Sequence, residues 1–229
     1  MTSVVSIRRY PVKSMGGESL QTIEVDERGL VGDREYAVRD ADSRLAAGKS
    51  TKRMVRRDGI FEFRAATQPE GVVVTGPGGR HAVVGAPHLD VWLSDALAAD
   101  VAVAPETDVP HFDDGAISLV GTATLDWCAR ELDVDADARR LRANLVVDTS
   151  EPFEEEGWQG DVRIGSAVLR PAGRIERCRT IDLAQDGVDT ETRWLKALGD
   201  KRDLRVAIYL DVVTPGRIAV GDDVRLSRS

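Results

Sequence analysis

The two cysteines are the candidates for metal binding or nucleophilic chemistry, and their surroundings in the sequence differ. Cys178 lies between Arg177 and Arg179. Nearby positive charge favours the thiolate, the form that binds metals or attacks an electrophile. In an extended strand both arginines would point away from the face that carries Cys178, so an inert buried thiol stays equally open. Cys128 lies on the apolar face of an expected helix and is predicted to be a core residue.

Basic side chains gather in three clusters, although the chain carries a net charge of −8. Residues 44–57 contain six basic and no acidic residues, and residues 170–179 contain four arginines and one glutamate. Arg139, Arg140 and Arg142 form the third cluster. Guanidinium forks suit phosphate and lysine supplies a point charge, so the clusters favour an anion site over solvated surfaces. With 5% aromatic residues no base-stacking platform is visible, and we expect no nucleic-acid partner.

Other familiar chemistry has little support. The three histidines lack zinc-ligand spacing. The sequence contains no G-x-S-x-G elbow, no phosphate-binding G-x-x-x-x-G-K-[ST] loop and no G-x-G-x-x-G opening a helix. A thiol–base pair of Cys178 and His111 stays open, because one sequence gives no geometry. His81 and His88 are interpreted as loop or surface residues.

Short strands separated by turns must position these side chains. Alternating apolar residues predict strands at 23–25 and 206–210, and the turn at 76–79 predicts a hairpin. The segments after residue 206 look like a meander. The acidic stretch 151–156 is interpreted as a solvated loop.

Three helices are expected. Leu125, Cys128, Ala129 and Leu132 recur at helical spacing, and Thr122 or Thr124 would cap that helix. Shorter helices are expected at residues 89–99 and 190–198. Without a sustained strand–helix alternation, the pattern indicates a mostly β, barrel-like fold with a few helices. A polar, proline-containing stretch at 105–110 divides the chain into domains 1–105 and 106–229.

Composition limits the class and the location of the protein. The 229 residues are 42% hydrophobic and 31% charged, which is typical of a soluble globular protein. No run approaches the roughly 18 apolar residues of a membrane span, and the first ten residues lack an apolar signal-peptide region. We therefore expect a cytoplasmic protein with free thiols and no membrane partner.

Several short motifs follow one another in a specific order. In the first half they are residues 10–14 (YPVKS) and 29–36 (GLVGDREY). In the second half they are residues 111–120 (HFDDGAISLV), 140–147 (RLRANLVV), 152–160, 177–180 (RCRT) with Asp182, and the turn at 216–222. Together the motifs resemble MOSC proteins, named for the molybdenum cofactor sulfurase C-terminal domain, and their N-terminal β-barrel domain.

The resemblance implies a fold and a cofactor. The MOSC domain would be a pyruvate kinase β-barrel-like unit at 106–229, packed with a smaller N-terminal β domain at 1–105. The implied cofactor is molybdenum bound to a pyranopterin dithiolene, and Cys178 matches the cysteine that ligates the metal. Pyridoxal phosphate binding is a further family-wide property, although the chain has no lysine motif for that cofactor. The positions matching pterin- and phosphate-binding residues are Lys13, Ser14, Arg34, Arg142 and Asn144, with Ser118 as an added hydroxyl donor.

Three functional hypotheses follow. The nearest functional relatives implied are the mitochondrial amidoxime-reducing component and bacterial reductases of N-hydroxylated compounds. We therefore expect an oxidoreductase of N-hydroxylated or N-oxide-type substrates in which Cys178 ligates molybdenum. With no four-cysteine iron–sulfur segment and no flavin site, it would need a separate ferredoxin- or flavin-type electron donor. The alternatives are a non-catalytic carrier of persulfide sulfur or cofactor on Cys178, and a MOSC-fold protein that binds another phosphorylated small molecule.

Overall fold

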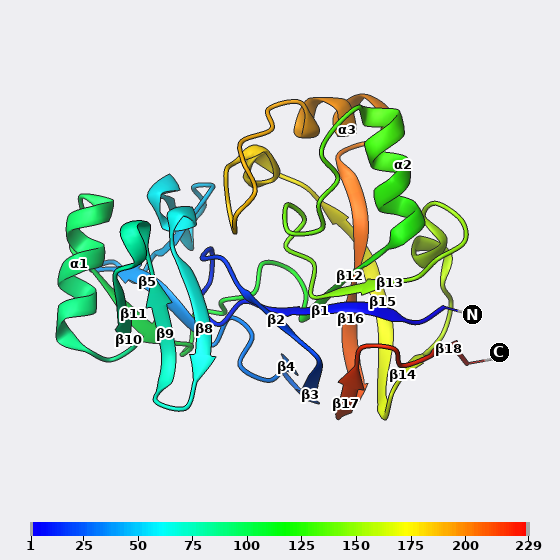
Figure 1. The fold of residues 1–229 in the computed structure, drawn as a ribbon, viewed down its shortest axis with the longest axis horizontal. Coiled ribbons are helices and arrows are strands. Elements are labelled where there is room, and N and C mark those ends of the chain that lie inside the picture. Colours follow the sequence, from blue (N-terminus) through cyan, green and yellow to red (C-terminus); the bar gives the residue numbers. More distant parts are fainter. Residues whose placement is uncertain (1, 228–229) are drawn as a thin grey trace.

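The computed structural model describes residues 2–227, which form two lobes side by side (Figure 1). The larger lobe is built on an eight-stranded sheet. Its order is β18 (Val224–Leu226), β14 (Val162–Ile164), β15 (Ala167–Glu176), β16 (Arg205–Thr214), β12 (Ile117–Gly121), β13 (Leu145–Val147), β1 (Val4–Arg9) and β2 (Glu18–Leu20). A second sheet, β17 (Gly216–Ala219), β3 (Thr22–Asp26) and β4 (Gly29–Leu30), shares its apolar core.

Two helices cover the other part of the larger lobe. They are α2 (Thr122–Leu132) and α3 (Trp194–Arg202), and they pack over a core that includes Cys128, Trp194 and Val206. Short 3-10 turns η3 (Glu154–Gly157) and η4 (Arg179–Asp182) lie near these helices. The apolar stripe of α2 supplies the burial that holds it on the sheet.

The smaller lobe combines two small sheets and one helix. The first sheet is β11 (Val101–Pro105), β5 (Tyr36–Asp40), β6 (Leu45–Ala47) and β7 (Met54–Arg56). The second is β10 (His81–Val83), β9 (Gly71–Thr75) and β8 (Arg64–Gln68). The remaining elements are α1 (Pro87–Leu97), η1 (Asp58–Glu62) and η2 (Pro77–Gly79). Phe63 and Trp92 meet edge to face in its core, with ring centroids 5.1 Å apart.

The mostly β fold with a few helices is confirmed, as are the 72–84 hairpin and the helices near 89–99 and 122–132. Three expectations are wrong in detail. The last strands do not form a meander, because β17 pairs with β3 and β18 pairs with β14. The third helix begins at Trp194 rather than near 190. No threonine caps α2, whose N-cap is Gly121.

The acidic stretch 151–156 is not wholly a solvated loop. Glu155 is fully buried, and its carboxylate accepts hydrogen bonds of 3.0 Å from Gly121 N and from Thr124 Oγ1. Burial raises the pKa of Glu155, and the hydrogen bonds oppose that rise. The carboxylate therefore anchors this segment beneath the start of α2, which composition alone does not reveal.

The two lobes do not follow the order of the sequence. Strands β1 to β4 come from the first 30 residues, yet β1 pairs with β13 and β3 pairs with β17, both from the second half of the chain. The predicted domain boundary at residue 105 stays a prediction. It does not coincide with the boundary between the lobes, because strands from both sides of it pair in the larger lobe. Within residues 2–227, no helix is both long and apolar enough to cross a lipid bilayer.

Candidate functional site: a basic pocket between the lobes

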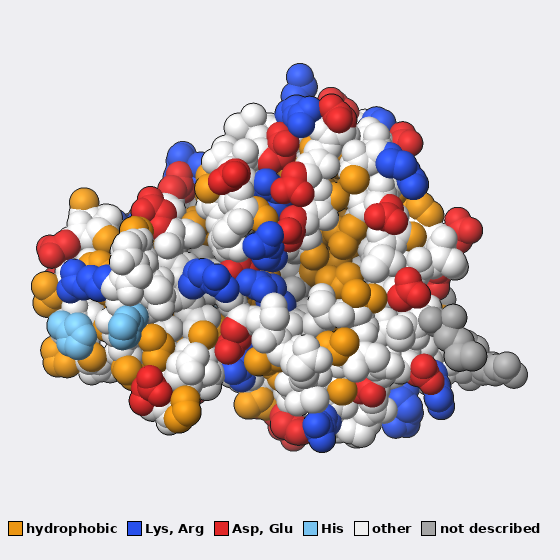
Figure 2. All heavy atoms as spheres, in the orientation of Figure 1, with side chains coloured by type: hydrophobic (Ala, Val, Ile, Leu, Met, Phe, Trp, Pro, Cys, Tyr) orange, Lys and Arg blue, Asp and Glu red, His pale blue; other side chains and the backbone are white. Residues whose placement is uncertain are grey.

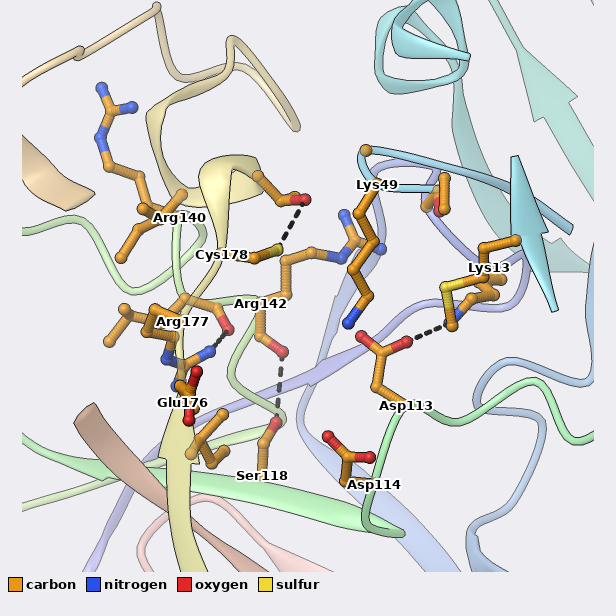
Figure 3. A pocket seen from close by; sticks show the side chains of 18 of the residues that line it. Lys13, Lys49, Asp113, Asp114, Ser118, Arg140, Arg142, Glu176, Arg177 and Cys178 are labelled. Atoms are coloured by element: carbon orange, nitrogen blue, oxygen red, sulfur yellow. Dashed lines mark hydrogen bonds and ion pairs between the residues drawn. The ribbon is translucent and has the colours of Figure 1, made fainter. Parts of the chain in front are cut away.

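A pocket lies where the lobes meet, and its walls come from both halves of the chain (Figure 3). It encloses about 840 Å³ including its open mouth. Basic side chains also gather near the middle of the face in Figure 2, where the two lobes join. Six of the seven residues predicted from the sequence line the pocket: Lys13, Ser14, Arg34, Ser118, Arg142 and Cys178.

Cys178 reaches the pocket because the chain leaves strand β15 just before it. The strand ends at Glu176, and Cys178 is the N-cap of η4, half-buried. Its sulfur lies 3.3 Å from Thr180 Oγ1. The strict alternation of a strand therefore no longer applies, and Cys178 is not fully buried. Cys128, in contrast, is buried in the core, and burial raises its pKa to about 12.

The arginines on either side of Cys178 have different partners. Arg177 donates from Nε and Nη2 to Val206 O (3.0 and 2.9 Å) and from Nη1 to Leu141 O (2.8 Å). Burial lowers its pKa to about 10, and no carboxylate in residues 2–227 pairs with it. Arg179 turns to the smaller lobe, where it donates to Gly48 O and forms a 2.7 Å ion pair with Asp58. One arginine thus leaves a positive charge near the sulfur, and the other ties the Cys178 loop to the opposite lobe.

Lys13 follows strand β1, and its side chain reaches the segment that joins the lobes. Its Nζ donates to His111 O at 2.7 Å and to Asp113 Oδ1 at 2.8 Å. The side chain is 6% exposed, and burial lowers its pKa while Asp113 opposes that shift. An ammonium has three hydrogens, so two acceptors leave one for a ligand in the pocket.

Asp113 is a pocket residue that the sequence analysis did not single out. Desolvation would raise its pKa, but the charges of Lys13 and Lys49 hold that pKa well below its usual range. Lys49 points toward Asp113 across the pocket, and the Asp114 carboxylate faces the same hollow (Figure 3). The anionic side of the pocket therefore lies at this segment, and the basic side lies around Arg34 and Arg142.

Ser14, Arg34 and Arg142 share an uncommon backbone conformation. Their φ angles are +69°, +51° and +51°, in the left-handed region that non-glycine residues rarely adopt. Arg34 pairs with the buried Asp33, and Arg142 donates to Met15 O at 2.7 Å. Burial would lower the pKa of Arg34, but the Asp33 carboxylate raises it above its ordinary value. Such strain persists where surrounding contacts enforce it, and it gathers at ligand sites.

Asn144 lies behind the pocket wall rather than on it. Its Oδ1 accepts from Ser118 Oγ at 2.9 Å and from Ser118 N at 3.1 Å, while its Nδ2 donates to Arg8 O. Ser118 is 5% exposed and its Oγ lies 3.2 Å from Arg142 O. Asn144 Oδ1 also lies 3.4 Å from Arg34 Nη1. Asn144 therefore acts on the pocket from behind, through Ser118 and Arg34.

Most of the basic clusters are used elsewhere. Within residues 44–57, only Lys49 among the basic side chains lines the pocket, while Arg44 and Arg56 pair with aspartates. Arg140 also lines the pocket, but its guanidinium extends away from Cys178 in Figure 3 and pairs with Asp135. The clusters of basic residues in the sequence therefore indicate the site only in part, because most of their members lie outside the pocket lining.

His111 does not act as a base for Cys178. It is fully buried outside the pocket lining, with Nδ1 2.9 Å from Arg34 O and Nε2 2.9 Å from Arg39 Nη2. A carbonyl accepts and a guanidinium donates, so the ring is neutral with its hydrogen on Nδ1. Burial lowers its pKa to about 4, which agrees with that assignment.

The side chains of the pocket suit a metal whose other ligands come from a cofactor rather than from the protein. No group of three or more His, Cys, Asp or Glu side chains within residues 2–227 is arranged to hold an ion. The pocket instead offers the one thiol of Cys178, and thiolates suit soft, sulfur-ligated metals. Positive charge and an unused Lys13 hydrogen are available for an anionic ligand. These residues fit a dithiolene-bound molybdenum with a phosphorylated pterin.

The fold and site define a two-lobed β protein with a thiol in a basic pocket between the lobes. The MOSC domain matches residues 101–225, and the MOSC N-terminal beta barrel domain matches residues 1–106. The chain belongs to the MOSC family.

Curated relatives match a limited part of the chain. The molybdenum cofactor sulfurase of Oryza sativa subsp. japonica is 42% identical over 59 residues, which are 26% of this chain and 7% of that protein. The molybdenum cofactor sulfurase of Danio rerio is 31% identical over 80 residues, or 34% of this chain and 10% of that protein. The chain thus spans a tenth or less of the length of these relatives.

A solved structure supports the fold over the whole chain. The YuaD protein from Bacillus subtilis superposes with a TM-score of 0.55 at 14% sequence identity, covering 98% of this chain and 94% of that one. The mostly β, two-lobed architecture is therefore shared with a solved protein.

Proposed function

We propose that this protein is a molybdenum-cofactor-binding oxidoreductase that reduces N-hydroxylated or N-oxide-type substrates, with Cys178 as the protein ligand to the metal. The observation that carries the proposal is the meeting of the Cys178 sulfur with Lys13, Arg34 and Arg142 on the walls of one pocket. These residues come from positions as far apart as 13 and 178 in the chain.

Each wall has a separate task in this proposal. Arg34, Arg142 and the remaining hydrogen of Lys13 bind the anionic part of the cofactor, and the Ser118 hydroxyl adds a short polar contact. Cys178 fixes the metal end. When bound, the molybdenum cofactor supplies the two-electron chemistry that removes oxygen from an N–O group. A separate ferredoxin- or flavin-type reductase provides the electrons.

The first test compares metal loading with turnover. Wild type, Cys178→Ser and the matched core control Cys128→Ala are expressed in a host that makes the cofactor. Wild type and Cys128→Ala are expected to contain molybdenum and pterin fluorescence and to reduce an amidoxime with a reduced artificial donor. Cys178→Ser is expected to lose turnover. Wild-type protein with molybdenum at background level in elemental analysis contradicts the proposal.

A sulfur carrier is the second candidate, favoured by the sulfurase names of the curated relatives and by the half-exposed Cys178. In that case Cys178 holds a persulfide or delivers cofactor without turnover. Cyanide-labile sulfur that is present in wild type and absent in Cys178→Ser, together with no reductase activity, selects this function.

A further inference from the structure

Tyr10 lies directly behind the basic wall of the pocket and touches three arginines. Its side chain is fully buried. The guanidinium carbons of Arg142, Arg34 and Arg8 lie 4.3, 5.0 and 5.8 Å from the centroid of its ring. Within about 6 Å, a cation is attracted to the negative face of an aromatic ring. Two of these three arginines, Arg34 and Arg142, line the pocket.

A hydrogen bond from the Tyr10 hydroxyl does not explain why this side chain is buried. Within the described part of the chain, the buried Tyr10 Oη has no hydrogen-bond partner. An unsatisfied buried hydroxyl opposes folding. Burial also raises the pKa of Tyr10 to about 12, so the phenol is neutral and cancels none of the neighbouring charge. The ring itself is the part of this side chain that interacts favourably with its surroundings.

The three arginines differ in how their charges are balanced. Arg8 forms a 2.5 Å ion pair with the buried Asp186, and Arg34 pairs with Asp33. Across residues 2–227, no carboxylate pairs with Arg142. The cluster of three guanidiniums and two carboxylates therefore keeps one positive charge.

The uncompensated charge is held at the pocket by neutral groups. Arg142 donates to Met15 O at 2.7 Å, lies 3.4 Å from Gln185 Oε1 and stacks on Tyr10. Burial lowers its pKa, but the guanidinium stays protonated at neutral pH, so the burial of its charge must be offset by favourable contacts. The Tyr10 ring, 4.3 Å from the Arg142 guanidinium carbon, offers a favourable contact that opposes the repulsion from Arg34.

We propose that Tyr10 is a positioning residue whose ring holds Arg34 and Arg142 at the wall of the pocket, so that both guanidiniums address one phosphate-like ligand. The backbone reinforces this arrangement, because Tyr10 N donates to Asp33 Oδ1 at 2.8 Å and Tyr10 O accepts from Arg34 N at 2.7 Å. This inference rests on the proposed function only in taking the ligand to be anionic.

Two substitutions separate the ring from the hydroxyl. Tyr10→Phe keeps the ring and removes the unpartnered oxygen, whereas Tyr10→Leu removes the ring. Phe63→Leu is the matched control, because Phe63 is a buried aromatic residue in the core of the smaller lobe, away from the arginines. All four proteins are compared by thermal unfolding and by calorimetric titration with inorganic phosphate.

Tyr10→Phe is expected to bind phosphate within about twofold of wild type and to unfold at the same or a higher temperature. Tyr10→Leu is expected to bind about fivefold more weakly, while Phe63→Leu loses stability but not affinity. Equal affinity in wild type and Tyr10→Leu overturns the proposal. So does a loss in Tyr10→Phe as large as that in Tyr10→Leu.

A second measurement does not need a ligand. In side-chain NMR spectra, ring currents should displace the Nε–H resonances of Arg34 and Arg142 in wild type and Tyr10→Phe, and this displacement should vanish in Tyr10→Leu. Unchanged arginine resonances in Tyr10→Leu overturn the positioning role. Wild type that binds no phosphate contradicts the proposed anion site, and the arginine resonances still decide on Tyr10 separately.

Discussion

Lys13 Nζ lies 2.8 Å from Asp113 Oδ1, and this ion pair joins residues 100 positions apart in the lining of the pocket. Lys13 follows the first strand of the chain, and Asp113 belongs to the segment that links the two lobes. The contact therefore balances the Lys13 charge within the pocket lining. It also makes the stability of the junction depend on the ionisation of Asp113.

Asp113→Asn is expected to lower the free energy of unfolding at pH 7 by about 1–2 kcal/mol, because buried Lys13 loses a charged acceptor. The folded-state pKa of Asp113 lies below its usual value. Its contribution is therefore present above the unfolded pKa of about 3.9 and is lost as pH falls toward the folded pKa. Urea unfolding between pH 7 and pH 2 measures this, and the two curves should converge in acid. Asp114→Asn, which removes no ion pair among residues 2–227, serves as the control and should have a small effect.

Arg179→Ala is expected to loosen the Cys178 loop. The substitution removes the hydrogen bond to Gly48 O and the fork to Asp58, which tie η4 to the smaller lobe. Hydrogen exchange should become faster in residues 178–182 and 48–58, with the cores unchanged. A double-mutant cycle with Asp58→Asn should give a coupling of about 0.5–1 kcal/mol. Arg193→Ala, which removes an exposed pair with Asp133, is the control. Unaltered exchange near Cys178 would show that other contacts hold the loop.

Gly115→Ala is expected to destabilise the pocket wall by about 1–3 kcal/mol through overpacking. A Cβ at this position would lie 2.5 Å from Tyr209 Cγ, and the Tyr209 ring lines the pocket. Gly157→Ala is the matched control because a Cβ there meets no atom within 4 Å. Thermal unfolding of both variants, with and without Tyr209→Ala, checks the cause. If Tyr209→Ala does not relieve the defect, the clash is not with that ring.

Glu155→Gln is expected to remove one source of pH dependence from the larger lobe. Burial raises the folded pKa of Glu155, so the folded state holds this proton more tightly than the unfolded chain. Its effect is to reduce the free energy of unfolding as pH rises from about 4.3, the unfolded value, through the folded pKa. In Glu155→Gln the free energy of unfolding should depend less steeply on pH over that range. In the exposed control Glu151→Gln its pH dependence should equal that of wild type. If the free energy of unfolding of Glu155→Gln depends on pH as steeply as that of wild type, Glu155 is not the source of this pH dependence.

Local patterns in the sequence predicted much of the fold. Helix α2 follows from the apolar stripe of Leu125, Cys128 and Leu132, and the hairpin follows from the turn at 76–79. The partners of the last strands were not predictable in the same way. Alternation at Ile218 identifies a buried face but not that β17 pairs with β3, some 190 residues earlier.

The site was predicted where a motif carried it and missed where only folding brings residues together. Cys178 and Arg142 come from recognisable motifs, and both line the pocket. Asp113 lies inside the motif at 111–120, yet nothing in that motif indicates a pairing with Lys13. The burial of Tyr10 behind Arg34 depends on long-range packing, so it could be found only in three dimensions.

The passage of the first 30 residues into the larger lobe makes the two halves of the polypeptide mutually dependent. Cut at residue 105, the C-terminal fragment would expose the edge of β13 and the apolar face that β3 covers. The C-terminal fragment would therefore not be a self-sufficient folding unit, and expressed alone it should aggregate. Co-expression of the two fragments offers a route to reassembly, in which β1 pairs again with β13 and β3 pairs again with β17.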